Sequence, residues 1–288
     1  MLSIPPFTDL TPPHPAFRQP TDGRADAAQR RRLKRELAEA VAQGALALHY
    51  QPRVSLRTGL PVGAEALARW PHRRRGLVPP GAFLPLAEEA GLMTGIGGWT
   101  LATACAEAAL WPDGPSGARP GVSVNIAACQ LADQALLGQV AAALERSGLA
   151  PERLELELGE ATLGEAATAG GDLDLLLTLS AIRDLGVGLA VDNFGTGLAS
   201  LSMLRRLPLT TMKLDRSLVR GVPEQAEDAA ILRALVQAAH ALGLCVVAEG
   251  VETEAQRAFL AGIGCDEAQG YLFAAPMPAE RLIERLGG

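Results

Sequence analysis

The chain has 288 residues, of which 48% are hydrophobic and 20% charged, and its formal net charge is -6. This composition is typical of a globular protein and excludes an intrinsically disordered chain. The acidic balance argues against a protein that holds DNA or RNA by bulk electrostatics. No apolar run approaches the roughly 18–20 residues of a membrane span, and the four cysteines form no CxxC pair. We therefore expect a cytoplasmic protein without a membrane span and without a nucleic acid partner.

The first part of the chain is rich in proline and shows no helical or alternating pattern. It predicts a disordered leader over residues 1–28, followed by one domain over residues 29–288. The segment 25–43 has the spacing of a helix and carries a basic cluster at residues 30–35. A solvated helix face is the favoured interpretation of this cluster, and contact with a membrane or a nucleotide is the alternative.

Beyond this segment, short apolar or alternating runs are separated by helix-like stretches. This alternation is typical of parallel strands joined by helical crossovers. Eight strand-like runs in about 250 residues favour a single α/β domain with a TIM-type (β/α)8 barrel over an open sheet. The runs are 45–54, 61–67, 121–127, 153–158, 187–192, 210–215, 244–249 and 267–273, and the helix-like stretches include 134–147, 172–185, 226–242 and 253–262.

A polar residue ends or interrupts seven of these eight runs. In a TIM-type barrel the C-terminal ends of the strands converge on one mouth, where catalytic groups lie. One polar residue can simply end a strand, but the same feature on seven strands indicates a functional site. The residues are Glu65, Asn125, Glu157, Asp192 with Asn193, Lys213, Glu249 and Gln269.

Four of these residues are carboxylates that would face one another. Two carboxylates about 4 Å apart repel by roughly 4 kcal/mol at an effective dielectric near 20, so an ionised cluster needs cations. Carboxylate and amide oxygens favour Mg²⁺ or Mn²⁺ over zinc, and a pair of such ions clamps the attacking and leaving oxygens of a phosphoryl displacement. Lys213, one of only two lysines, adds a compact positive charge, with a salt bridge to Asp215 as the alternative.

The motifs around these residues resemble those of the EAL domain, which is named after Glu65-Ala66-Leu67 in GAEALARW. The resemblance runs from about residue 33 to the C-terminus. It implies a modified TIM-type barrel and a cyclic di-GMP phosphodiesterase that forms linear pGpG, or a degenerate relative that binds the nucleotide or another protein. We also expect a homodimer. The other matching motifs are YQP at 50–52, SVNIAACQL at 123–131, LELELGEA at 154–161, VDNFGTG at 191–197, MKLDRSLV at 212–219, VVAEGVET at 246–253 and QGYLFAAPMP at 269–278.

The resemblance further implies a set of metal ligands. Glu65, Asn125, Glu157 and Asp192 match the ligands of one ion. Asp192 would bridge to a second ion, which Glu249 also holds.

The remaining matches concern water, substrate and a loop. Lys213 matches the lysine that orients the nucleophilic water, and Gln269 matches a glutamine near that water. Glu160 resembles the glutamate that steadies the loop from Gly195 to Leu201, and Glu252 has only a supporting role. The substrate contacts match Gln51, Leu67 and Arg69, with Arg69 placed for a phosphate.

The sequence departs from the family pattern at the second metal. Where the family motif reads DDFGTG, this chain has Asn193 in place of the second aspartate. The formal negative charge of the ligands therefore falls by one, and the second ion should bind weakly. Gly159 replaces a threonine, and Leu198 and Ala199 stand where an aromatic residue and a serine are common. Three hypotheses remain open: a weakened phosphodiesterase, a receptor that binds cyclic di-GMP without turnover, and a protein-interaction domain.

Overall fold

The structure is a computed structural model that describes residues 23–114, 117, 119–160, 162–163, 172–196 and 201–286. Most of the predicted leader, residues 1–22, lies outside the described residues, and so do Leu198 and Ala199. The described residues fall into two compact units. One takes the chain up to Leu46 together with Arg69–Gly91, and the other takes Ala47–Ala68 and the chain from Leu92 onward.

Eight strands of the second unit form a closed barrel, which confirms the predicted fold class. Their order around the barrel is β1-β9-β8-β7-β6-β5-β4-β2, and pairing of β1 with β2 closes it. Strand β2 and strands β4 to β9 pair in parallel, whereas β1 runs antiparallel to β9. The strands are β1 (Ala47–Ser55), β2 (Pro61–His72, with residues up to Ala68 in this unit), β4 (Gly121–Ile126), β5 (Leu154–Gly159), β6 (Gly188–Phe194), β7 (Thr211–Leu214), β8 (Cys245–Ala248) and β9 (Glu267–Ala268).

The reversed direction of β1 departs from the parallel strands that the alternation predicts. Only residues 56–60 connect β1 to β2, and they form a tight turn in which Ser55 N donates to Leu60 O at 3.0 Å. Gly59 supplies the left-handed conformation of this turn, with φ of 72°. A parallel pair needs a crossover of about a dozen residues, so this short connection makes a hairpin instead.

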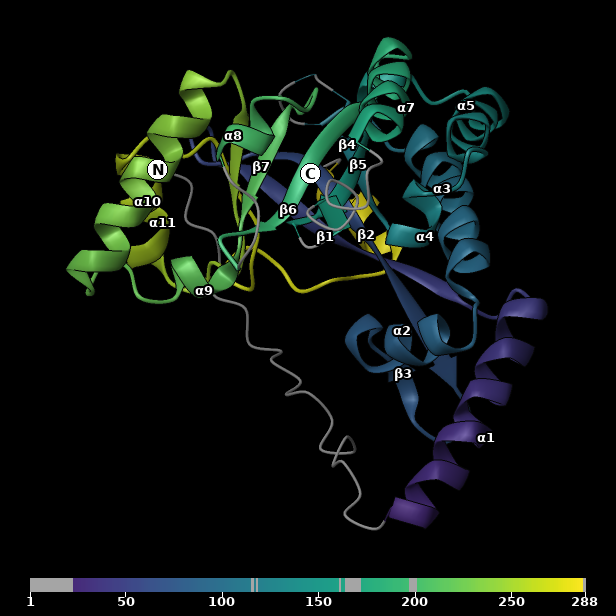
Figure 1. Ribbon diagram of the computed structural model, residues 1–288. Helices are drawn as coiled ribbons and strands as arrows, with labels where there is room; N and C mark the ends of the chain where they lie inside the picture. The colour runs from purple at the N-terminus through teal and green to yellow at the C-terminus, as the bar shows by residue number, and fades with distance from the viewer. Residues whose placement is uncertain are drawn as a thin grey trace. The chain divides into compact units, whose positions relative to one another are not determined.

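Helices cover the outside of the barrel. In Figure 1, α3 (Met93–Ala109), α5 (Leu136–Ser147) and α7 (Asp172–Asp184) lie together beside β4 and β5. The four predicted helix-like stretches correspond to α5, α7, α10 (Ala226–Ala241) and α11 (Glu254–Gly262), with ends within two residues. The shorter elements are α4 (Ala128–Leu131), the 3-10 turn η1 (Pro151–Arg153), α8 (Leu201–Leu204), α9 (Arg216–Val219) and α12 (Ala279–Leu286).

The first unit contains α1 (Gly23–Ala42), β3 (Gly76–Val78) and α2 (Pro80–Glu89). The end of β2 continues into this unit and forms an antiparallel hairpin with β3. The basic cluster on α1 is largely paired with carboxylates: Arg30 and Lys34 both contact Glu89, and Arg32 contacts Glu36. This pairing agrees with a solvated helix face. In the described part of the chain, no helix is both long and apolar enough to cross a membrane.

Candidate active site

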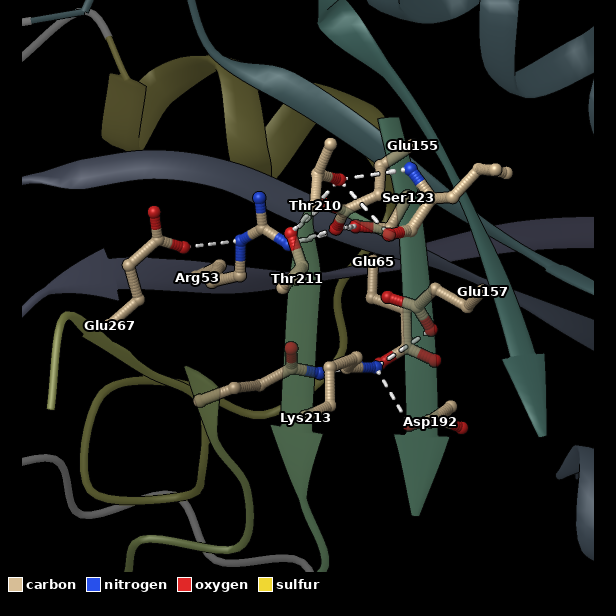
Figure 2. A network of polar contacts seen from close by, with 12 residues as sticks. Arg53, Glu65, Ser123, Glu155, Glu157, Asp192, Thr210, Thr211, Lys213 and Glu267 are labelled. Carbon is tan, nitrogen blue, oxygen red and sulfur yellow. Dashed lines mark hydrogen bonds and ion pairs between the residues drawn. The ribbon is translucent and has the colours of Figure 1, made fainter. Parts of the chain in front are cut away.

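Four carboxylates, on β2, β5 and β6 and directly after β8, converge on the ammonium group of Lys213 at one mouth of the barrel. Lys213 Nζ lies 2.6 Å from Glu249 Oε1, 2.7 Å from Glu157 Oε2, 3.2 Å from Asp192 Oδ1 and 3.4 Å from Glu65 Oε2. Lys213 is fully buried and Glu157 is 1% exposed. We call these five residues the Lys213 layer; Figure 2 shows it apart from Glu249, which carries no label there.

The alternation of residues along the strands explains this convergence. On β5, Leu154, Leu156 and Leu158 are buried on the face toward the helices, so the glutamates between them point into the barrel. Neighbouring strands are in register at this level, since Asn125 of β4 pairs with Glu157 of β5. The sequence prediction that the polar strand ends meet therefore agrees with the structure.

Strand β6 carries an irregularity at the site. The register between β6 and β7 shifts between Val191 and Phe194, and Asn193 adopts a left-handed conformation with φ of 56°. Asparagine accepts this conformation more readily than most residues. The bulge turns Asp192 into the barrel and leaves Asn193 exposed, with Asn193 Nδ2 donating to Asp192 Oδ2 at 2.6 Å.

Three amide side chains border the carboxylates. Gln269 Nε2 donates to Glu65 Oε2 at 2.7 Å and to Gln51 Oε1 at 3.0 Å. Asn125 Nδ2 donates to Glu65 Oε1 at 2.8 Å, and Gln51 Nε2 donates to the Ala274 carbonyl at 3.0 Å. These bonds fix the orientation of Glu65 and join β1 to β9 at the mouth.

Glu160 lies directly after β5 and holds the start of the loop that follows β6. Its Oε2 accepts hydrogen bonds from Gly195 N at 2.9 Å and Thr196 N at 3.0 Å. This contact is the one that a loop-steadying glutamate would make. The loop residues after Thr196 that the sequence analysis singled out lie outside the described residues.

The electrostatics of the Lys213 layer show an excess of negative charge. Burial, together with the charge of Glu65, raises the pKa of Glu157 well above its usual range. Burial also raises the pKa of Glu249 to about 7. Burial opposes the charged form of Lys213, yet the four surrounding carboxylates raise its pKa well above the ordinary lysine value. For Glu65, burial is outweighed by Lys213 and the amide donors, so its pKa is lowered.

The donor set fits a hard divalent cation. Four carboxylates share one ammonium group, and Glu157 Oε1 is buried without a hydrogen-bond partner among the described residues. Carboxylate and amide oxygens are the ligands that Mg²⁺ and Mn²⁺ prefer. In the described part of the chain no three of these side chains are arranged around a common metal position, because the oxygens turn toward Lys213.

The EAL domain family model matches residues 34–276, most of the described barrel and its flanking helices. The chain belongs to the EAL domain family. The bifunctional diguanylate cyclase/cyclic di-GMP phosphodiesterase MucR of Pseudomonas aeruginosa is 43% identical over 259 residues, which are 90% of this chain and 37% of MucR. The cyclic di-GMP phosphodiesterase NbdA of the same organism is 41% identical over 261 residues, 90% of this chain and 32% of NbdA.

A solved structure of the PaMucR phosphodiesterase in complex with c-di-GMP has the same fold. It superposes with a TM-score of 0.80 at 43% identity and covers 87% of this chain and 99% of that chain. This EAL domain spans about a third of the length of the two curated relatives, 37% and 32%. The homologues of this EAL domain therefore include cyclic di-GMP phosphodiesterases.

Other residues matched to the EAL pattern lie outside the Lys213 layer. Leu67 and Arg69 follow Glu65 on β2; Leu67 is half-buried and Arg69 is buried in the first unit. Glu252 has an exposed side chain, and its backbone N–H donates to Gln256 Oε1 at 2.8 Å. The alternative salt bridge from Lys213 to Asp215 is wrong, because Asp215 Oδ1 caps α9 by accepting from Ser217 N at 2.8 Å.

A second polar cluster in this EAL domain was missed by the sequence analysis. It surrounds Arg53 and lies closer than Lys213 to the N-terminal ends of the parallel strands (Figure 2). We call it the Arg53 layer. Its signal in the sequence is that each of five strands carries a second polar residue, two positions away from a residue of the site. The members are Arg53, Ser123, Glu155, Thr211 and Glu267.

Proposed function

We propose that this EAL domain hydrolyses cyclic di-GMP to linear pGpG with the help of Mg²⁺ or Mn²⁺, at a rate that Asn193 reduces. The observation that carries the proposal is the convergence of three buried carboxylates and the half-buried Glu249 on Lys213 in a member of this family. The names of the relatives supply the reaction class, and the solved complex supplies the ligand.

EAL phosphodiesterases generally depend on divalent metal ions, and the ligands here fit such ions. Bound ions would polarise the scissile phosphate and activate water. Glu65, Asn125, Glu157 and Asp192 would hold the first ion. Glu249 and Asp192, with the neutral oxygen of Asn193, would hold the second one weakly.

The hydrolysis adds one water across one phosphodiester bond. The water oxygen bonds to phosphorus, the bond from phosphorus to the 3′ oxygen breaks, and that oxygen takes up a proton. Negative charge grows on the phosphoryl oxygens, and the buried ammonium of Lys213 stabilises it. Gln51 and Arg69 would hold the nucleotide, Arg69 at a phosphate, and Gln269 would orient the water.

A second candidate function is a receptor that binds cyclic di-GMP without turnover. The observation that favours it is the hydrogen bond from Asn193 Nδ2 to Asp192 Oδ2, because it occupies an oxygen that the second ion would need. An aspartate at this position would offer an additional carboxylate instead of an amide donor.

One experiment separates the two functions. The purified chain is titrated with cyclic di-GMP in Ca²⁺, in Mg²⁺, in Mn²⁺ and in chelator, and bound nucleotide and linear product are measured together. The phosphodiesterase predicts product in Mg²⁺ or Mn²⁺. The receptor predicts metal-dependent binding without product. If neither nucleotide binding nor product is observed, the protein-interaction hypothesis is the one that remains. The homodimer and the cytoplasmic location stay predictions, which size-exclusion chromatography and cell fractionation would test.

A further inference from the structure

The Arg53 layer joins strands that lie far apart around the barrel. The Arg53 guanidinium on β1 contacts Glu155 Oε1 on β5 through Nη1, and its Nε lies 2.6 Å from Glu267 Oε2 on β9. Strand β5 is separated from β1 by β4 and β2, so the first contact crosses the barrel interior. Thr211 Oγ1 on β7 donates to Glu155 Oε2 at 2.5 Å, which adds a fourth strand.

Each member of this layer lies two positions from a residue of the active site or its amide border. Since side chains two apart on a strand share one face, the two layers are stacked along the same strands (Figure 2). A shift of one layer must therefore move the other. The pairs are Arg53 with Gln51, Ser123 with Asn125, Glu155 with Glu157, Thr211 with Lys213 and Glu267 with Gln269.

Strand β1 is held by its hairpin with β2, by the backbone hydrogen bonds between Tyr50 and Met277, and by a short ladder to β9. Its register with β9 covers two residue pairs, Val54 with Ala268 and Ser55 with Glu267, and β9 is only two residues long. Most parallel neighbours are held over longer ladders, such as the five pairs between β4 and β5, although β8 and β9 share only two pairs. Gln51 nevertheless has to meet Gln269 at 3.0 Å at the mouth.

We propose that Arg53 is a positioning residue that holds β1, and with it Gln51, at the mouth of the barrel. The guanidinium suits this task because its planar fork meets two carboxylates at once: Nη1 donates a hydrogen bond to Glu155, and Nε forms an ion pair with Glu267. A lysine would keep the charge but would present a single point that cannot bridge both carboxylates in the same way. The inference deepens the proposed function, on which its kinetic readout rests.

The test compares Arg53→Lys with Arg153→Lys as a matched control. Arg153 is a buried arginine of the same unit, whereas Arg53 is half-buried, and it donates to the carbonyls of Pro120 at 3.0 Å and Ala108 at 2.7 Å, away from the site. For Arg53→Lys we expect KM for cyclic di-GMP to rise about tenfold while kcat changes less than about twofold, because Gln51 contacts substrate rather than the reacting bond. If the chain binds without turnover, the dissociation constant in Ca²⁺ replaces KM.

A second readout needs no nucleotide. The side-chain amide signals of Gln51 and Gln269 in NMR spectra should move in Arg53→Lys and stay in place in Arg153→Lys. If the wild-type chain neither binds nor hydrolyses cyclic di-GMP, the proposed function fails, and these signals alone decide the role of Arg53.

Removing the charge altogether leaves the half-buried Glu155 and Glu267 without their cation, so Arg53→Met alone can unfold the chain. The neutral variant Arg53→Met/Glu155→Gln/Glu267→Gln avoids this and should show the same rise in KM and the same shifted signals. The proposal is overturned if Arg53→Lys and the neutral variant keep the wild-type KM and glutamine signals. It is also overturned if Arg153→Lys changes them equally.

Discussion

The Lys213 layer and the Arg53 layer are built from the same strands and lie two residues apart, yet their charges are balanced differently. Four carboxylates share the ammonium of Lys213, whereas two carboxylates share the guanidinium of Arg53. In the Arg53 layer the hydroxyls of Ser123 and Thr211 also donate to Glu155.

The pKa values follow this difference. Burial opposes ionisation of Glu155, but Arg53 and Thr211 outweigh it and lower its pKa. Burial raises the pKa of Glu157 and Glu249, and one lysine does not offset it. Glu267 of the Arg53 layer departs from this pattern, because burial raises its pKa even though Arg53 opposes the shift. The comparison indicates that the Lys213 layer, with four carboxylates to one cation, has the larger excess of negative charge and is the better suited to bind cations.

The largest expected effect is the loss of stability when a substitution breaks the charge balance of the Lys213 layer. Replacing Lys213 by methionine leaves three buried carboxylates and the half-buried Glu249 without a cation, so in chelator the free energy of unfolding should fall by about 3–5 kcal/mol. Mn²⁺ should restore part of this loss. Urea denaturation with chelator or Mn²⁺ measures both effects.

The control is Lys34→Met, the only other lysine of the chain, which pairs with Glu89 on the surface and should cost little stability. Lys213→Arg should lower turnover strongly and leave the dissociation constant of the nucleotide comparatively unchanged, because the guanidinium is too broad for a point-charge role. Equal stability of Lys213→Met and the wild-type chain would contradict the charge imbalance.

The next effect concerns pH. Burial gives Glu249 a folded pKa of about 7 against an ordinary value of 4.5, so the folded protein holds this proton more tightly than the unfolded chain. The contribution of Glu249 to stability should therefore be greatest below about pH 4.5 and decline by about 3 kcal/mol as the pH rises to about 7 in chelator. Glu249→Gln should lack this decline. Denaturation across this pH range measures the difference in stability between the wild-type chain and Glu249→Gln, with the exposed Glu252→Gln as control. Parallel pH profiles of stability for the wild-type chain and Glu249→Gln would refute the prediction.

Adding a negative charge beside the Lys213 layer should strengthen its metal binding and so widen its difference from the Arg53 layer. Asn193→Asp supplies a fifth carboxylate, and ~2 kcal/mol of better metal binding corresponds to about thirtyfold higher occupancy far from saturation. Product formation should rise most at low Mn²⁺, and the gain should shrink as Mn²⁺ increases. A metal titration of the rate measures this.

Asn193→Gly is the matched control, because glycine accepts the left-handed backbone but brings no charge. It should not raise activity. Undetectable product in Asn193→Asp at every metal concentration would show that Asn193 is not the limiting defect. The changes at Gly159, Leu198 and Ala199 would then be the better explanation.

The smallest effect concerns the loop that Glu160 holds. Glu160→Gln weakens the charge-assisted bonds to the backbone of Gly195 and Thr196, so kcat should fall about tenfold while folding stays two-state. Steady-state kinetics at saturating metal measure it. Glu152→Gln on the exposed surface of η1 serves as control, and a kcat equal to that of this control would rule out the loop role.

Much of the barrel and its mouth could be predicted from the sequence. Strands buried on both faces give apolar runs, and the polar residues at their ends are conspicuous because each interrupts such a run, as Glu157 does between Leu156 and Leu158. The direction of β1 was harder to predict, since it depends on the five-residue turn rather than on the pattern of the strand itself.

Features set by tertiary packing escaped prediction. Helix α3 contains Gly95, Gly97 and Gly98, which weaken a helical signal, but a Cβ at Gly97 would lie 2.0 Å from Gln130 Oε1. Close packing therefore requires glycine there. The Arg53 layer was missed because its residues sit within strands, where an isolated charge looks like an exposed position until the barrel closes around it.

The requirement of a metal ion for product formation tests the central claim most directly. The chain is stripped of metal, incubated with cyclic di-GMP with and without Mn²⁺, and assayed for pGpG, beside Glu157→Gln treated in the same way. The account predicts pGpG only for the wild-type chain and only with Mn²⁺. Equal pGpG from the stripped chain in chelator, or from Glu157→Gln, would contradict it.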